Sequence, residues 1–197
     1  LLSGRYTATV EIAPLDVPGS SCIECGGPLR IEYEDELLHI FCTDCEETHG
    51  QFTVPPALLE QFDREELPMA FNRWIRSQFA QAVAGFCPNC SGRLDRSIDI
   101  DDDDNYMAVY SCRRCGDQVT ASVPASLLYS PEVIAFAYEN GIDAVNSPYW
   151  ELDWLRKGNT KVRSTEPLEL RVRISIEGEI LDVTVDEDLE VLEAVRQ

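Results

Sequence analysis

The alternation of apolar and polar residues is longest near the end of the chain. From 168 to 177, leucine, valine and isoleucine alternate with charged and hydroxyl residues without a break. A period of two predicts a strand that buries one face. Three shorter segments lie across turn residues from it and are expected to complete the sheet: 160–165, 180–185 and 189–195. We therefore predict an antiparallel β-meander over residues 148–197.

Two further segments are considered for strands: residues 150–154, which fit either a strand or a helix, and residues 6–12 near the start of the chain. Residues 150–154 alternate Trp, Leu and Trp with acidic residues, which predicts a strand. The Ser-Pro pair at 147–148 is also a typical start for a short helix through the second tryptophan, so both interpretations stay open. Residues 6–12 form another expected strand.

Spacings of three and four residues predict helices in the middle of the chain. The positions that recur on one helix face are Phe71, Trp74, Ile75, Gln78, Phe79, Ala82 and Val83. Pro68 near the start and Gly85 beyond the end are typical helix boundaries. A second helix is expected within 129–147, because Ser130-Pro131 is a typical N-cap and first turn, and Asn140-Gly141 is a typical stop.

All eight cysteines stand in Cys-x-x-Cys pairs. They are Cys22 with Cys25, Cys42 with Cys45, Cys87 with Cys90, and Cys112 with Cys115. The pairs are 16 residues apart in the first set of four and 21 apart in the second, a spacing typical of structural zinc. Two thiolates on one tight turn can face a single ion, and two such turns complete a closed tetrahedron. We predict two Zn²⁺ ions, each held by four cysteines.

Disulfides, iron and thiol redox chemistry are the competing interpretations. Disulfides need an oxidising compartment, and cysteines this close in sequence make poor structural bridges. An iron site of the rubredoxin type uses the same ligands, and the segment 87–90 partly resembles such a site. Ligand type and spacing nevertheless favour zinc. His39 and His49 lie near the first set in sequence. Four thiolates already saturate an ion, so we expect both histidines on the surface or in packing contacts.

The two cysteine sets lie in segments of one design. Each has a predicted hairpin and a third strand, at 28–33, 37–41 and 51–54 in the first and at 93–100, 106–111 and 118–123 in the second. The third strands run into Val54-Pro-Pro-Ala-Leu-Leu59 and Val123-Pro-Ala-Ser-Leu-Leu128. Corresponding cysteine pairs are offset by 65 and 70 residues, which indicates a duplication with a longer second hairpin.

Charge bears on the environment of the protein more than on its fold. The chain has 36 acidic and 16 basic residues, a net charge of −20, and 14 of the basic residues are arginine. This balance excludes binding of bare nucleic acid through bulk charge. Because 44% of the residues are apolar, the acidity is compatible with a folded core and indicates a salt-rich cytoplasm. The sequence contains no run of 18 apolar residues that would predict a membrane span.

These patterns predict a mostly β, α+β protein, made of two duplicated four-cysteine zinc ribbons joined by amphipathic helices and a C-terminal antiparallel β-meander. The expected segments are an N-terminal strand and linker (1–17), zinc ribbon 1 (18–60), a linking helix (61–85), zinc ribbon 2 (86–128), a helix (129–147) and the meander (148–197). Because the chain begins at Leu1 without Met, we expect an upstream part of a longer protein to precede it.

Several motifs resemble one protein family. They are the first ten residues, Cys22-Ile-Glu-Cys-Gly-Gly-Pro-Leu29, Ala70-Phe-Asn-Arg-Trp74, Cys87-Pro-Asn-Cys90, Pro148-Tyr-Trp150 and the final strands. Over essentially the whole chain they look like the C-terminal region of ArsR-type winged-helix transcriptional regulators of halophilic archaea. The resemblance implies a regulator whose DNA-binding winged helix lies upstream of Leu1. No winged helix is recognisable in these 197 residues, so DNA contact is expected only through that upstream domain.

The sequence therefore leads to one main function hypothesis and one alternative. The main hypothesis is a zinc-stabilised accessory domain that serves dimerisation, sensing or partner binding in the cytoplasm, with a second copy or another protein as partner. The alternative is a freestanding zinc-ribbon adaptor that binds protein or RNA through Arg93, Arg96, Arg113 and Arg114; we expect these arginines to pair with nearby aspartates instead. An enzyme is not expected, because the sequence holds no nucleophile motif and no phosphate-binding glycine loop.

Overall fold

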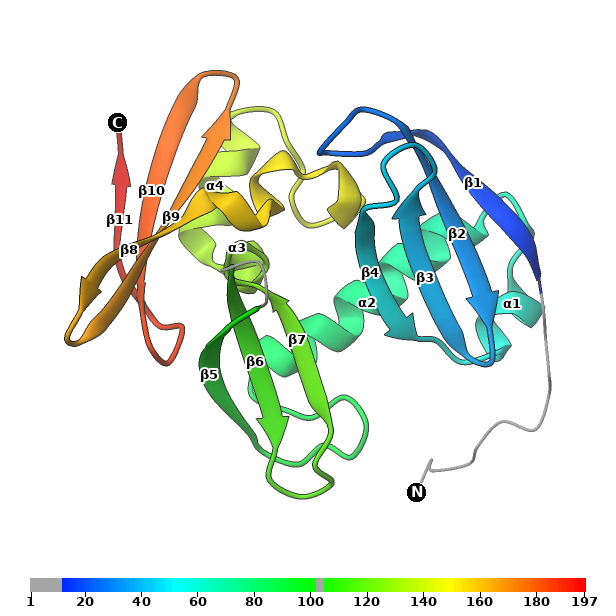
Figure 1. The fold of residues 1–197 in the computed structure, drawn as a ribbon, viewed down its shortest axis with the longest axis horizontal. Helices are drawn as coiled ribbons and strands as arrows, with labels where there is room; N and C mark the ends of the chain where they lie inside the picture. Colours follow the sequence, from blue (N-terminus) through cyan, green and yellow to red (C-terminus); the bar gives the residue numbers. More distant parts are fainter. Residues whose placement is uncertain (1–11, 102–104) are drawn as a thin grey trace. The chain divides into compact units, whose positions relative to one another are not determined.

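The computed structural model describes residues 12–101 and 105–197, which are mostly β with several helices, as the predicted fold class requires (Figure 1). The chain divides into two compact units between Arg76 and Ser77. Each cysteine set lies in its own unit. The boundary falls within a helix that the sequence predicts as the link after the first set.

The first unit is built on one antiparallel sheet in the order β1-β2-β3-β4 (Figure 1). Its strands are β1 (Ile12–Ser21), β2 (Pro28–Glu34), β3 (Leu37–Cys42) and β4 (Thr48–Thr53). Alternate residues of β2 and β3 are buried, so the sheet covers a core with one face. The strand expected at 6–12 lies, apart from Ile12, outside the described residues.

Two helices follow this sheet, α1 (Ala57–Gln61) and α2 (Leu67–Val83). The predicted helix over 71–83 is confirmed, with a start four residues earlier. Within the first unit, Phe71 is fully buried and the Trp74 indole N–H donates to the Thr53 carbonyl at 3.4 Å. Arg64 donates to the carbonyls of Ala13 and Pro14 and so ties the segment before α2 to β1.

After the end of α2, the second unit forms a three-stranded antiparallel sheet of β5 (Leu94–Ile100), β6 (Tyr106–Cys112) and β7 (Gln118–Ser122). Then come α3 (Val123–Ser126), the 3₁₀ turn η1 (Leu127–Tyr129) and α4 (Pro131–Glu139). Ser130 does precede α4, as predicted, but its hydroxyl makes no cap bond. The predicted N-cap position and first-turn proline are confirmed, and the hydroxyl donates to the Glu132 carboxylate.

The strand interpretation of 150–154 is wrong, and the helical alternative is nearer. The segment forms the 3₁₀ turns η2 (Tyr149–Glu151) and η3 (Asp153–Leu155), followed by η4 (Lys157–Asn159). Trp150, Leu152 and Trp154 are each 2% exposed. One tryptophan points inward from each turn and the extended Leu152 links them, so the alternation records burial and not a strand.

The chain ends in a second four-stranded antiparallel sheet in the order β11-β10-β9-β8. Its strands are β8 (Thr160–Thr165), β9 (Leu168–Ile176), β10 (Glu179–Asp186) and β11 (Val191–Arg196), in agreement with the predicted meander. The core of the second unit joins this sheet to the helices and to the three-stranded sheet, through residues such as Tyr110, Phe136, Trp154, Val172 and Val183. Of the described helices, none has the length and apolar character that crossing a membrane requires.

Candidate metal centres

The eight cysteines lie in four turns that share one backbone pattern. In each turn the N–H of the first cysteine donates to the carbonyl five residues later, at 2.8–2.9 Å. The N–H four residues after that cysteine donates back to its carbonyl, at 2.8–3.1 Å. The donor residue has a positive φ in every turn, and it is glycine in two of them, Gly26 and Gly116, and Ser91 or Glu46 in the others. Four separate stretches of sequence therefore fold into the same cysteine turn.

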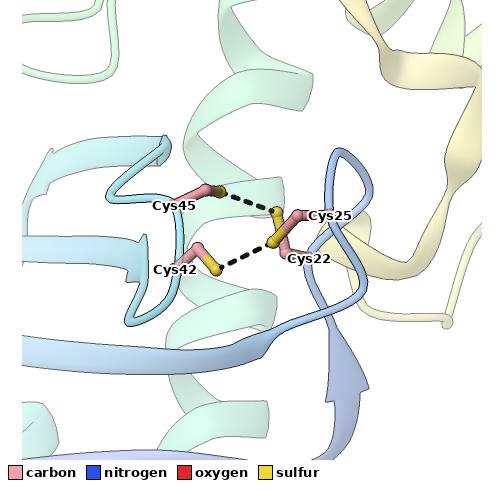
Figure 2. A group of neighbouring side chains, drawn as sticks. All are labelled: Cys22, Cys25, Cys42 and Cys45. Carbon is pink, nitrogen blue, oxygen red and sulfur yellow. Dashed lines mark hydrogen bonds between the residues drawn. The ribbon is translucent and has the colours of Figure 1, made fainter.

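The turns meet in pairs and bring four sulfurs together in each unit. Figure 2 shows the first set, in which the sulfurs of two loops face one another. Cys22 Sγ lies 3.7 Å from Cys45 Sγ, and Cys25 Sγ lies 3.5 Å from Cys42 Sγ. All four sulfur atoms lie within 4.8 Å of one another. The connection comes from strand pairing: one turn precedes β2, the other follows β3, and the start of β2 pairs with the end of β3, where Leu29 lies opposite Cys42.

The second set repeats this arrangement. Cys87 Sγ lies 3.7 Å from Cys115 Sγ, Cys90 Sγ lies 3.5 Å from Cys112 Sγ, and again all four sulfurs lie within 4.8 Å of one another. A tetrahedron with metal–sulfur bonds of about 2.3 Å has edges of about 3.8 Å. The sulfur separations are close to that edge, so both groups can hold a metal ion. The eight cysteines form no disulfide, and all of them are among the described residues.

Two glycines stand where the facing turn of each set approaches closely. A methyl group on Gly92 would lie 3.1 Å from Cys112 Sγ and 3.2 Å from Cys90 Sγ. Gly27 holds the equivalent position in the first set, where a methyl group would lie 2.7–2.9 Å from the Asp44 side chain. A methyl group at position 92 would therefore crowd two sulfurs, and one at position 27 would crowd the side chain of the facing turn.

The family of the chain is identified by a match that spans these turns. A family model described as "Domain of unknown function (DUF7351)" matches residues 19–191. The chain belongs to this family. The region matched to DUF7351 includes all eight cysteines and most of the final sheet. No curated protein and no solved structure matches the chain.

In each group of four cysteines, backbone N–H groups lower the pKa of one thiol. The backbone N–H groups of Cys45 and Asp44 lower the pKa of Cys42 to about 7. Those of Cys115 and Arg114 lower the pKa of Cys112 to about 6. A backbone N–H also lowers the pKa of Cys45 and Cys115, but contacts with neighbouring sulfurs and burial raise it more, to about 12. A bound metal cation favours the thiolate form of all four sulfurs, so metal binding releases protons.

The two histidines have different surroundings, and sequence reasoning missed one of them. His39 fits the expected packing role, because it stacks on Phe41 with ring centroids 4.9 Å apart and contacts the Thr48 hydroxyl. His49 lies instead with Nε2 3.3 Å from Cys22 Sγ. It is not a member of the four-sulfur group, so it contacts a ligand from outside. Its position just after the second cysteine turn was the available signal.

Two of the four arginines near the second set are engaged in ion pairs. Arg113 Nε donates to both carboxylate oxygens of Asp95 at 2.8 and 2.7 Å. Arg96 pairs with Glu190 and donates to the Val83 carbonyl. Arg93 and Arg114 are exposed. The predicted pairing with aspartate therefore holds for Arg113, whereas Arg96 pairs with a glutamate from a distant strand end.

Proposed function

We propose that the chain is a zinc-stabilised accessory domain of an ArsR-type transcriptional regulator, and that each cysteine set binds one Zn²⁺. The observation that carries the metal assignment is the pair of four-sulfur groups with tetrahedral edge lengths. Four thiolates in a closed set suit a structural zinc ion, which cross-links two turns and leaves no position for a substrate. In this proposal the two units carry duplicated zinc ribbons.

The metal content of the purified chain tests the first part of this proposal. We expect two zinc ions per chain by inductively coupled plasma mass spectrometry after expression in zinc-containing medium. Replacement by cobalt is expected to give the visible absorption of tetrahedral Co²⁺ with thiolate ligands. A chain that folds with no zinc, or that carries iron in both sets, would contradict the assignment.

The regulator part rests on the sequence resemblance and on charge. A domain with a net charge of −20 is repelled by a phosphate backbone, so DNA contact would belong to an upstream winged helix. We propose that this domain works in the reducing cytoplasm, where cysteines stay available for metal, and that it pairs with a second copy or another protein.

Two measurements test the regulator assignment. Chromatin immunoprecipitation of the tagged full-length gene product is expected to recover discrete promoter regions. Sedimentation velocity of the present chain is expected to give a dimer, and mobility-shift assays are expected to detect no DNA binding by it alone. A full-length product that is never enriched on chromatin would contradict the assignment.

The alternative is a freestanding ribbon adaptor that binds RNA or protein. It would use the arginines around the second set, of which Arg93 and Arg114 are exposed. The ion pairs of Arg113 and Arg96 support the regulator proposal over this alternative. Fluorescence anisotropy with labelled RNA across a salt series separates the two. Binding that is lost in the double variant Arg93→Ala/Arg114→Ala would favour the adaptor.

A further inference from the structure

The two sulfur sets have equivalent backbones but opposite charges at one equivalent position. Asp44 and Arg114 each follow the first cysteine of their turn by two residues, and each donates its N–H to that cysteine's sulfur at 3.4 Å. Each also lies against the glycine of the facing turn. A Cβ on Gly27 would be 2.9 Å from Asp44 Cβ, and one on Gly92 would be 3.0 Å from Arg114 Cβ. The side chains of Asp44 and Arg114 therefore start from equivalent positions beside the two centres.

The rest of the turns extends this difference in charge. The turns of the first set, 22–27 and 42–47, contain four acidic residues and no basic one. The turns of the second set, 87–92 and 112–117, contain two arginines and one aspartate. A dication held by four thiolates has a net charge of 2 − 4 = −2. Carboxylates beside such a centre raise its electrostatic energy, whereas guanidinium groups lower it.

Access to the sulfurs differs in the same sense. Cys25 and Cys45 of the first set are both exposed. In the second set Cys115 is exposed and Cys90 is half-buried, while Cys87 and Cys112 belong to the apolar core of the second unit. A competing ligand in solution therefore reaches more sulfur atoms in the first set than in the second.

The contact of His49 with Cys22 has no counterpart in the second set. His49 stands four residues after Cys45, and the residue four after Cys115 is Val119, which has no polar atom in its side chain. The imidazole Nε2, 3.3 Å from Cys22 Sγ, can donate a hydrogen bond to a thiolate in a centre whose turns carry no basic residue. The first centre thus has a histidine contact that the second lacks, and the turns of the second carry two arginines that the first lacks.

We infer that the two centres have different roles: the second is a permanent structural site, and the first is an exchangeable Zn²⁺ site whose rate of metal loss is limited by the hydrogen bond from His49 to Cys22. The inference rests on the proposed zinc binding and deepens it. If the domain senses anything through its metals, zinc availability is read at the first centre.

Metal release from the intact chain tests this directly. The chain is loaded with two zinc ions, and release to the chromogenic chelator 4-(2-pyridylazo)resorcinol is followed by stopped-flow absorbance. We expect two phases of equal amplitude, and the rate constant of the faster phase should exceed that of the slower by about tenfold or more. The double variant Cys25→Ser/Cys45→Ser is expected to remove the fast phase, and Cys90→Ser/Cys115→Ser the slow one.

Charge exchange at the equivalent position avoids loss of ligands, so it remains informative where cysteine variants fail to fold. Asp44→Arg is expected to slow the fast phase, and Arg114→Asp to speed the slow one, each by about tenfold. Both effects should shrink as salt is raised, because the charges are exposed and salt screens them. Rate changes that are independent of salt would mean that packing and not charge is responsible, and would overturn the electrostatic argument.

The role of His49 has its own matched control. His49→Leu is expected to speed the fast phase alone, and His49→Gln, which keeps an N–H donor, to restore part of the difference. Val119→Leu, at the equivalent position, should leave both phases unchanged. Zinc that leaves both centres at one rate, or a slow phase that belongs to the first set, would overturn the inference and leave zinc binding intact. A chain that carries no zinc would overturn the proposed function itself.

Discussion

Gly92 and Gly27 illustrate how a methyl group in place of a hydrogen atom would change the space beside each cysteine set. The position is equivalent in the two sets, two residues after the second cysteine of a turn. Around Gly92 the nearest atoms are sulfurs and Arg114 Cβ, and around Gly27 they belong to the Asp44 side chain. A sulfur atom that must ligate a metal cannot move aside, whereas the exposed Asp44 side chain is not a ligand and can be truncated by mutation. The two glycines are therefore replaceable to different degrees.

We predict that Gly92→Ala removes the second metal, because the new methyl group occupies space 3.1–3.2 Å from two ligand sulfurs. Gly27→Ala should weaken the first centre, and the double variant Gly27→Ala/Asp44→Ala should restore it. Zinc content and thermal unfolding of the purified variants check both expectations. Full zinc occupancy in Gly92→Ala would show that the turn can relax around the methyl group.

Thr160 offers a gain in stability at one residue. Its hydroxyl is buried and has no hydrogen-bond partner within the described part of the chain. Thr160→Val keeps the shape and removes the unsatisfied group, so we expect the unfolding free energy to rise by about 1 kcal/mol in urea titrations. Thr184→Val is the control, since the Thr184 hydroxyl accepts a hydrogen bond from Arg163. That variant is expected to lose stability; a gain in both would indicate a general effect of valine in the sheet.

At the scale of elements, periodicity was most reliable where a whole strand had one buried face. The residues of β9 alternate between buried and exposed along nearly the full strand, and the prediction for that segment is confirmed. The same alternation failed at 150–154, because two 3₁₀ turns also bury every second residue. Cysteine spacing predicted which sulfurs meet, since ligands of one ion must converge. The sequence did not reveal the position of His49 against Cys22, because a contact between a strand and a distant turn leaves no periodic signal.

The β9–β10 hairpin carries an ion pair that makes its stability depend on pH. Arg173 donates two hydrogen bonds of 2.9 Å to Asp182, whose side chain is 8% exposed, and this lowers the pKa of Asp182. A carboxyl group with a lowered pKa stabilises the fold above its unfolded pKa of about 3.9, and that contribution is lost as pH falls through the folded pKa.

We therefore expect Asp182→Asn to cost about 1–2 kcal/mol at neutral pH. The difference from the unmodified chain should be constant above about pH 5 and should shrink at lower pH. Chemical unfolding at a series of pH values measures it. Arg173→Gln should reproduce the loss at neutral pH, and a difference that grows towards acid pH would reverse the assigned sign.

Metal removal should affect the elements unequally. The strands β2 to β4 form a small sheet whose cysteine turns would be cross-linked by metal, whereas β9 and β10 are held by a continuous apolar core. We expect a chelator, or Cys25→Ser, to abolish hydrogen-exchange protection in β2 to β4 and to leave β9 and β10 protected. Added zinc should restore protection in the chelated sample. An unchanged melting curve in the fully metal-stripped protein would refute this expectation.

At the scale of the whole molecule, the net charge of −20 acts on the folded state through self-repulsion. Salt shortens the Debye length to about 3 Å at 1 M and relieves that repulsion. We predict that the thermal midpoint rises between 0.1 M and 2 M potassium chloride by roughly 4–8 °C, which corresponds to about 2 kcal/mol for a domain of this size. A midpoint that falls with added salt would show that attractive ion pairs outweigh the repulsion.

In the four cysteine turns, the backbone hydrogen bonds are the same and the side chains between the cysteines differ. Their backbone bonds involve only N–H and carbonyl groups, which every residue type except proline at a donor position supplies. The residues between the cysteines can therefore differ in charge, as Asp44 and Arg114 do, while the backbone of the turn keeps its shape. Two cysteine sets with one backbone geometry can therefore differ in metal affinity without any difference in the fold of their turns.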